Sequence, residues 1–300
     1  MTRSRLFLKN SASIAVYSIA AAVCGICLCG CFNSPARVYY NTDNIAKSFE
    51  EVALKDYRLE LSARLVGSTL WLYMPVTDLF VKAPEPVKYP EKFKILTNNG
   101  EFTENSFVGT YHITPITPKD KSQDYKINKD ISDKIGTIWK LIRRVLFNID
   151  PSQRDDIKFV IMVAGDVKNG FEVKQTFYYK DLKKVSYGLI NIWEFQHRVI
   201  QDSGLSPLVI GDKTGRHLEY YDLTLQEFVR QQIEYRVSLK FQKPEVEQNV
   251  DINEEVGKIV AATMQMYELT HIDKIQFQNM ETNTTVTLSS DDIWGKDKKK

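Results

Sequence analysis

The chain has 300 residues, with 40 Lys and Arg against 38 Asp and Glu and a formal net charge of +2. A chain of this length can bury a substantial core without the help of disulfide bonds. Electrostatic capture of nucleic acid needs clustered basic residues, and because no such cluster stands out we expect no nucleic-acid partner. All four cysteines lie within the first 31 residues, which excludes a disulfide framework or a thiolate metal site in the rest of the chain.

Residues 1–30 have the features of an export signal. Arg3, Arg5 and Lys9 give a basic start, and the stretch 11–28 (SASIAVYSIAAAVCGICL) carries no charge. At about 18 residues, this stretch is at the lower limit for a helix that spans a bilayer. The composition alone therefore leaves both a cleaved signal and a retained anchor open. Without the three basic residues of the signal, 37 basic residues face 38 acidic ones.

The four residues Leu28-Cys29-Gly30-Cys31 resemble the lipobox of bacterial lipoproteins: an aliphatic residue, a tolerant position, a small residue and a cysteine. The resemblance covers only the targeting segment. It implies that the signal is cut between Gly30 and Cys31, that the Cys31 sulfur carries lipid, and that acyl chains such as palmitate are added to the new amino terminus. Two or more chains hold a protein firmly on a membrane. In the alternative reading, the cysteines are small buried residues of an uncleaved helix.

The same resemblance gives an expected location in the cell envelope, with the folded part outside the cytoplasm. Lipoproteins that stay on the inner membrane of two-membrane bacteria often carry Asp after the cysteine. Phe32 stands there instead, which favours the outer membrane if the organism has two. The tether, 31–37, is short, so we expect the first folded element to lie close to the membrane surface.

Beyond the tether, a pattern of helix, two strands and an acidic-apolar pair occurs three times, with poor sequence identity between the copies. Apolar helix positions repeat at spacings of three or four residues, at Ile45, Phe49 and Val52, at Ile131, Ile135 and Ile138, and at Ile252, Val256 and Ile259. In the first copy the predicted strands are 57–66 and 69–74, and the closing pair is Asp78-Leu79. In the second copy they are 157–165 and 171–179, closed by Asp181-Leu182. In the third copy they are 272–278 and 285–289, closed by Asp292-Ile293. Any α+β chain offers helices before hairpins, and this simpler explanation stays open.

Hairpins combined with one-sided amphipathic helices predict an α+β fold, in which antiparallel β-hairpins are covered by helices. The pattern predicts three consecutive α+β units, 38–95, 105–202 and 205–295, followed by a basic tail, 296–300. Several further elements are expected between the repeats: a linker over Pro84–Pro90, a strand over Phe107–Ile116, a buried helix over Tyr187–Ile200, and a helix starting near Leu225 that is followed by a strand over 235–242.

The sequence offers no catalytic motif, and we expect neither a metal nor another cofactor. The four histidines, at 112, 197, 217 and 271, share no zinc-type spacing. The loop Gly211–His217 (GDKTGRH) has two glycines around Lys213 that could cradle an anion, although a surface turn fits the sequence better. The tyrosine pairs at 39–40 and 220–221 are candidate contact residues for a binding surface.

These observations favour a membrane-anchored envelope lipoprotein that acts by binding or scaffolding. Its expected partners are the membrane, through Cys31, and other envelope proteins or the cell wall. Two alternatives stay open: an envelope hydrolase that uses carboxylates as acid and base on cell-wall glycan or peptide, and an extracytoplasmic ligand receptor. No motif in the sequence supports the hydrolase.

Overall fold

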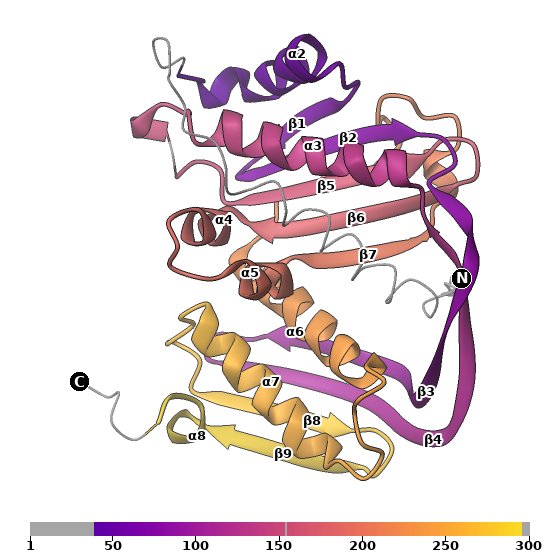
Figure 1. Ribbon diagram of the computed structural model, residues 1–300. Coiled ribbons are helices and arrows are strands. Elements are labelled where there is room, and N and C mark those ends of the chain that lie inside the picture. The colour runs from indigo at the N-terminus through magenta and orange to yellow at the C-terminus, as the bar shows by residue number, and fades with distance from the viewer. Residues whose placement is uncertain (1–38, 154, 296–300) are drawn as a thin grey trace. The chain divides into compact units, whose positions relative to one another are not determined.

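The computed structural model of the chain describes residues 39–153 and 155–295. The lipobox 28–31, the tether 31–37 and the basic tail 296–300 therefore lie outside the described residues. The described part is an α+β protein with two mixed β-sheets (Figure 1), which confirms the expected fold class. It divides into two compact units: unit 1 comprises the residues up to Pro86 and Gln123–Leu223, and unit 2 comprises Val87–Ser122 and the residues from Thr224 onward. This division differs from the three consecutive units expected from the sequence.

Unit 1 contains a five-stranded sheet with the strand order β1-β2-β5-β6-β7. Strands β2 and β5 pair in parallel, and the other neighbouring pairs are antiparallel. The parallel pair corrects the expectation of purely antiparallel sheets, because hairpins join only antiparallel strands and parallel ones need a crossover. The strands are β1 (Ser62–Val66), β2 (Thr69–Val76), β5 (Phe159–Asp166), β6 (Phe171–Tyr178) and β7 (Ile200–Leu205).

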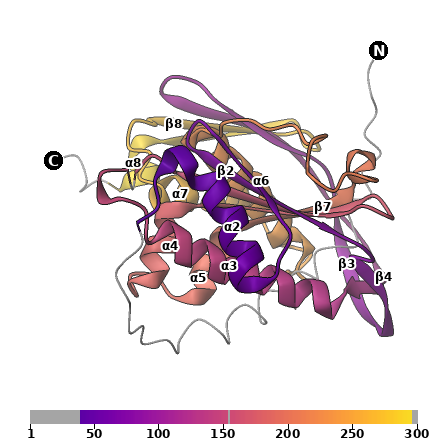
Figure 2. The ribbon, with the colours of Figure 1, turned by 90° about the horizontal axis from the view of Figure 1, so that it is seen from above.

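Helices α2 (Ile45–Tyr57) and α3 (Lys129–Leu146) cover one face of this sheet (Figures 1 and 2). The apolar stripe of α3 is buried in the same core cluster as the side chains of β2 and β5 that face the helices. Asn128 begins α3, since its side chain accepts a hydrogen bond from the backbone of Asp130. Removing these aliphatic side chains from water supplies most of the stability of the layer.

The first predicted strand begins later than its alternating sequence suggests. Tyr57 still belongs to α2, and Arg58 ends the helix in the left-handed conformation, with φ at 52°. The backbone N–H of Leu59 then donates to the carbonyl of Ala53 at 3.0 Å, which satisfies a carbonyl at the helix end. Strand β1 starts only at Ser62.

Strand β6 leads into two short helices, α4 (Tyr179–Ser186) and α5 (Ile192–Arg198), and β7 follows them. The expected helix over Tyr187–Ile200 is therefore too long at its start, because a loop occupies 187–191. The buried guanidinium of Arg198 donates to the buried carboxylate of Asp181 at 2.7 Å. This ion pair links the end of α5 to the first turn of α4.

Unit 2 contains a four-stranded sheet with the order β3-β4-β8-β9, in which β4 and β8 are parallel and β8 and β9 antiparallel. The boundaries between the units fall within β3 and β4. After β4 the chain passes through unit 1 and returns at α6; helices α6 and α7 then precede β8 and pack on the sheet (Figure 1). The elements are β3 (Phe80–Phe102), β4 (Ser106–Ile127), α6 (Leu225–Gln242), α7 (Ile252–Met266), β8 (Lys274–Asn279), β9 (Thr284–Ser289) and α8 (Ser290–Trp294).

Two sequence predictions in this region are wrong. The expected strand over 235–242 is the second half of α6, because the buried residues Val229, Ile233, Val237 and Phe241 continue at helical spacing. The expected linker Pro84–Pro90 lies inside β3. Its three prolines stand at even positions of an outer strand, so their missing N–H groups all fall along one edge, where prolines are tolerated. None of the helices in the described ranges is long and apolar enough to cross a bilayer.

The turn between β5 and β6 is organised by Asp166, whose side chain is 1% exposed. Its carboxylate accepts hydrogen bonds from the backbone N–H groups of Leu79, Lys168 and Asn169 at 2.9–3.0 Å. Burial alone would raise the pKa of Asp166, but these bonds and one from the Asn169 side chain outweigh it and lower that pKa. The carboxylate therefore stabilises the turn in its ionised form.

We expect Asp166→Ala to lower the free energy of unfolding at pH 7 by about 3 kcal/mol, because buried N–H groups lose their acceptor. Urea denaturation measures this change. Asp133→Ala, at an exposed position of α3, serves as the control and should change the stability by less than about 0.5 kcal/mol. Equal effects of the two substitutions would contradict this role of Asp166.

Candidate functional site

A cluster of charged side chains in unit 2 lies along α6. Glu227, Arg230 and Glu234 follow one another at spacings of three and four residues, which places them on one face of the helix. Thr224 begins the helix by accepting a hydrogen bond from the backbone of Glu227. The three charged side chains are half-buried.

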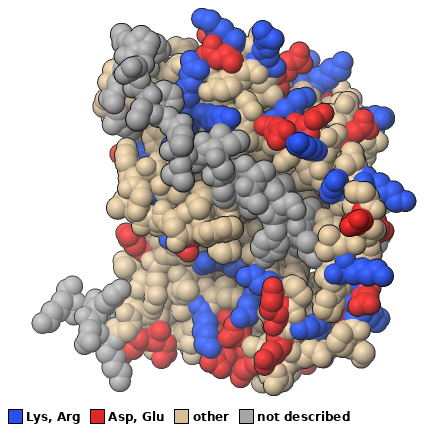
Figure 3. Space-filling view, viewed as in Figure 1, with Lys and Arg blue, Asp and Glu red and all other residues tan. Residues whose placement is uncertain are grey.

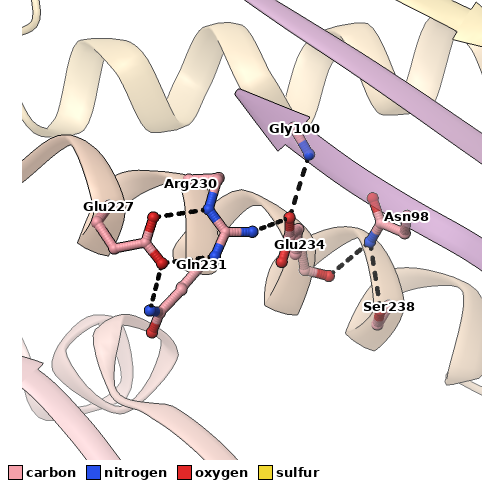
Figure 4. Close-up of polar contacts among 7 residues, drawn as sticks. All are labelled: Asn98, Gly100, Glu227, Arg230, Gln231, Glu234 and Ser238. Carbon is pink, nitrogen blue, oxygen red and sulfur yellow. Dashed lines mark hydrogen bonds and ion pairs between the residues drawn. The ribbon is translucent and has the colours of Figure 1, made fainter. Parts of the chain in front are cut away.

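Arg230 binds both carboxylates (Figure 4). Its Nε and Nη2 atoms donate to the two oxygens of Glu227 at 2.8 and 2.5 Å, and Nη1 donates to Glu234 at 2.5 Å. The side chain of Gln231 also donates to Glu227, at 2.9 Å. The pairing with Glu227 is the bidentate arrangement that suits a planar guanidinium.

The two carboxylates differ in their ionisation. Hydrogen bonds from Arg230 lower the pKa of Glu227 below its ordinary value. Burial raises the pKa of Glu234, and it outweighs the opposing effect of Arg230 although the two side chains are in contact. Hydrogen bonding to Glu227 in turn raises the pKa of Arg230. Such a separation of two carboxyl pKa values is one property of acid–base pairs in hydrolases.

The contacts of the cluster with β3 indicate a positioning role. The Glu234 carboxylate accepts a hydrogen bond from the backbone N–H of Gly100 at 3.1 Å, and the Asn98 side chain donates to the Glu234 carbonyl at 2.7 Å and to Ser238 at 3.3 Å. These bonds fasten α6 to β3 (Figure 4). Since the guanidinium already binds both carboxylates, the arrangement holds a helix in place more readily than it transfers a proton.

Sequence reasoning missed this cluster, although the signal was present. The segment from Glu227 to Glu234 (EFVRQQIE) carries opposite charges at i,i+3 and i,i+4 spacings, which are typical of ion pairs on a helix surface. The difference in pKa could not be predicted in this way, because it depends on how far each carboxylate is buried beneath β3.

Each unit also has an open surface depression. The one in unit 1 has a volume of about 600 Å³, lies beside β1, and is lined among others by Thr42, Arg64 and Asp156. Thr42 donates from its hydroxyl to Asp156 at 3.1 Å. The depression in unit 2, about 450 Å³, is lined by residues of the connection between α6 and α7, such as Lys243 and Glu247. No histidine lines either depression.

The glycine-bounded loop 211–217 forms a turn around its own aspartate. The carboxylate of Asp212 accepts backbone hydrogen bonds from Thr214 at 3.0 Å and His217 at 2.8 Å. Burial would raise the pKa of Asp212, but these backbone bonds lower it below its ordinary value. An anionic group at the centre of the loop opposes the binding of another anion, so the turn interpretation fits the geometry better than the anion cradle.

The other candidate side chains are dispersed. His112 lies on β4 and contacts the Glu281 carboxylate, which also accepts a hydrogen bond from Thr114. His197 is exposed in the last turn of α5 and His271 is exposed ahead of β8. Within 39–153 and 155–295, no three His, Cys, Asp or Glu side chains gather as metal ligands would.

The tyrosine pair 220–221 packs against the sheet of unit 1. The Trp71 ring lies 5.3 Å from that of Tyr220 and 5.1 Å from that of Tyr221, both edge-on. The indole of Trp71 donates to the carbonyl of Tyr221 at 3.0 Å, and the guanidinium of Arg64 lies 4.3 Å from the centre of the Tyr220 ring. These contacts support the sheet face opposite α2 and α3. Tyr39, the first described residue, is half exposed.

Charges of both signs are interspersed on the face shown in Figure 3, where neither sign forms a continuous area. The chain matches no protein-family model, no curated protein and no solved structure. Its function therefore has to be inferred from its own residues.

The Arg230 cluster predicts effects of different size for two matched substitutions. Because the pKa of Glu227 is lowered in the folded state, its ionised form stabilises the fold. This stabilisation is complete above the pKa of Glu227 in the unfolded chain, and it is lost as the pH falls through the pKa in the folded state. We expect Glu227→Gln to reduce the free energy of unfolding by about 1 kcal/mol at pH 7. In urea denaturation this difference should disappear in acid.

Glu234→Gln is the matched control, because glutamine resembles the protonated carboxyl that burial favours. Because the pKa of Glu234 is raised in the folded state, its protonated form stabilises the fold at low pH. This stabilisation is lost as the pH rises through the pKa of Glu234 in the folded state. The glutamine variant should therefore lose less stability at pH 7 than Glu227→Gln does. A larger loss for Glu234→Gln than for Glu227→Gln would contradict the assigned ionisation.

Proposed function

We propose that the chain is a lipid-anchored bacterial envelope protein whose folded part binds or scaffolds other components at the membrane surface, outside the cytoplasm. The observation that carries this proposal is Leu28-Cys29-Gly30-Cys31 at the end of an uncharged stretch and ahead of a polar one. Cys31 is the residue that carries the lipid. The components bound are other envelope proteins or the cell wall.

The attachment of the chain to unit 1 supports a position close to the membrane. The backbone N–H of Tyr40 donates to the carbonyl of Asn148 at 2.8 Å, and the carbonyl of Tyr40 accepts from Asp150 at 2.9 Å. Cys31 precedes Tyr40 by nine residues, and a fully extended segment of that length spans at most about 30 Å. A lipid on Cys31 would keep this edge of unit 1 within that distance of the bilayer.

Three buried or half-buried carboxylates have contacts and ionisation that disfavour a role as general acid. The buried or half-buried carboxylates of Asp166, Asp212 and Glu227 accept hydrogen bonds that hold turns and helices in place. Their pKa values are all lowered, whereas a general acid needs a carboxyl that stays protonated near neutral pH. These three groups are therefore poor general acids, and their hydrogen bonds hold the fold in place.

Cys31→Ser should abolish the incorporation of an alkynyl fatty acid when the full chain is expressed in bacteria, and should release the protein from the lipid-modified fraction. Cys29→Ser is the matched control, because it changes a cysteine at the tolerant position and should leave labelling intact. Unchanged labelling of Cys31→Ser would contradict the proposal. Loss of labelling in Cys29→Ser with labelling retained in Cys31→Ser would instead place the essential cysteine at position 29.

We further propose that three segments are related helix–hairpin units: α2-β1-β2, α3-β5-β6 and α7-β8-β9. Each has a helix followed by an antiparallel strand pair. The apolar residue of each closing pair is at most 2% exposed: Leu79, Leu182 and Ile293. A common role for this position supports a common origin for the units.

Equivalent closing residues should respond alike to truncation. We expect Leu79→Ala, Leu182→Ala and Ile293→Ala each to lower the free energy of unfolding by about 2–4 kcal/mol. Leu54→Ala, at an exposed position of α2, should cost less than about 0.5 kcal/mol. If one closing residue tolerated truncation as Leu54 does, the three positions would not be equivalent.

A further inference from the structure

The loop between α4 and α5 presents an unusually exposed group of apolar side chains. Tyr187, Leu189 and Trp193 are 71%, 73% and 63% exposed, the highest values among the large apolar residues that the structure describes. All three lie within one stretch of unit 1, 187–193. Single exposed apolar residues are ordinary, but a group of this kind marks a contact surface.

The backbone of this loop is held in a defined shape. Gly188 has φ at 72°, and the N–H groups of Gly188 and Leu189 donate to the carbonyls of Val185 and Lys184 at 3.2 and 2.9 Å. This is the double hydrogen bond with which a left-handed glycine ends a helix. At the other end, Asn191 begins α5 by accepting a hydrogen bond from the backbone of Glu194 at 2.8 Å.

This helix ending normally has an apolar contact that is missing here. The residue after the glycine usually packs against an apolar side chain in the last turn of the helix. That residue is Leu189, its counterpart is Lys184, and Leu189 is left exposed. The loop therefore projects its apolar side chains outward on a backbone that is already ordered. Binding through these side chains would not carry the entropy cost of ordering that backbone.

The loop lies near the start of the described chain. The ring of Tyr187 is 6.4 Å from the ring of Phe147. The next residue, Asn148, accepts the hydrogen bond from Tyr40 that attaches the start of the described chain to unit 1. A lipid on Cys31 and the apolar side chains of the loop would therefore reach the same membrane from the same edge of the unit.

The charges around the loop suit an anionic surface. Helix α4 presents Lys180, Lys183 and Lys184, which are exposed or half exposed. Lys183 lies 3.6 Å from the carboxylate of Asp155. The two carboxylates on α4 and α5, Asp181 and Glu194, are both bound to Arg198. The loop is thus flanked by excess positive charge, and each basic residue near an anionic membrane surface contributes about 1 kcal/mol of attraction.

We propose that the α4–α5 loop is a membrane-contact site, in which Tyr187, Leu189 and Trp193 enter the lipid interface and the lysines of α4 face anionic headgroups. Aromatic rings with a polar edge favour this interfacial depth. This inference rests on the proposed function, since the lipid anchor is what keeps the loop at the bilayer. The contact would fix the orientation of unit 1 on the membrane.

The test uses tryptophan fluorescence of the full chain, expressed in bacteria and reconstituted into vesicles of phosphatidylglycerol and phosphatidylcholine whose acyl chains carry bromine. Bromine quenches only tryptophans that enter the bilayer. Trp71 and Trp139 are buried in unit 1, and Trp294 is half-buried in unit 2, where its indole donates to the carbonyl of Ile272 at 3.1 Å. We therefore expect quenching to come chiefly from Trp193 and to fall by about twofold or more in Trp193→Phe. Leu189→Asp should reduce the quenching of Trp193 similarly.

Leu208→Asp is the matched control. Leu208 is also an exposed leucine of unit 1, but it follows the far end of β7, away from the loop (Figure 1), and its replacement should leave quenching unchanged. Equal quenching of wild type and Trp193→Phe would overturn the proposal. The proposal would also be overturned if Trp193 became protected from solvent without lipid, at concentrations where the chain self-associates. That result would assign the loop to contact with a second copy of the chain.

The two proposals can fail separately. Lipid labelling of Cys31 without quenching of Trp193 would leave the anchor in place and overturn the membrane contact of the loop. Quenching of Trp193 without lipid on Cys31 would support the contact site and overturn the lipid anchor.

Discussion

The parallel pairing of β2 with β5 is the constraint on which the rest of unit 1 depends. Parallel strands cannot be joined by a tight turn, so the chain has to cross the sheet between them, and α3 is the helix of that crossover. Its apolar stripe then covers both strands. In unit 2 the parallel pair β4 and β8 has the same position, with α6 and α7 between its strands. Each sheet thus joins two hairpins through one parallel pair, and the sheet of unit 1 has β7 as a fifth strand beside β6.

Local sequence patterns predicted the helices and most strands, but not how the strands are ordered. The stripe at Ile131, Ile135 and Ile138 is visible because helical spacing is a local property. Parallel pairing joins residues about 90 positions apart, as in the register of Leu70 with Val160, and no local pattern contains it. The prediction of a strand over 235–242 was wrong because the apolar residues of this segment also fit the helical spacing of α6.

The candidate sites show the same limit. The charge spacing on α6 contains the signal for the contacts of Arg230 with Glu227 and Glu234, although these contacts were not predicted. The opposite pKa shifts of the two carboxylates depend on burial by β3 and have no such signal. The apolar segment from Tyr187 to Trp193 was expected to be a buried helix, because apolar composition normally indicates burial. Gly188 instead ends α4, and the side chains beyond it are exposed. Apolar residues at a contact surface and in a core have the same local sequence.

We propose two membrane attachments at one edge of unit 1: a covalent one at Cys31 and a contact through the α4–α5 loop. The anchor is the central claim, since the contact depends on proximity to lipid. Mass spectrometry of the amino-terminal peptide, from protein isolated out of bacterial membranes, tests this claim most directly. The account predicts a chain that begins at Cys31 with a thioether-linked diacylglycerol. An unmodified Cys31, or a mature chain that begins elsewhere, would contradict it.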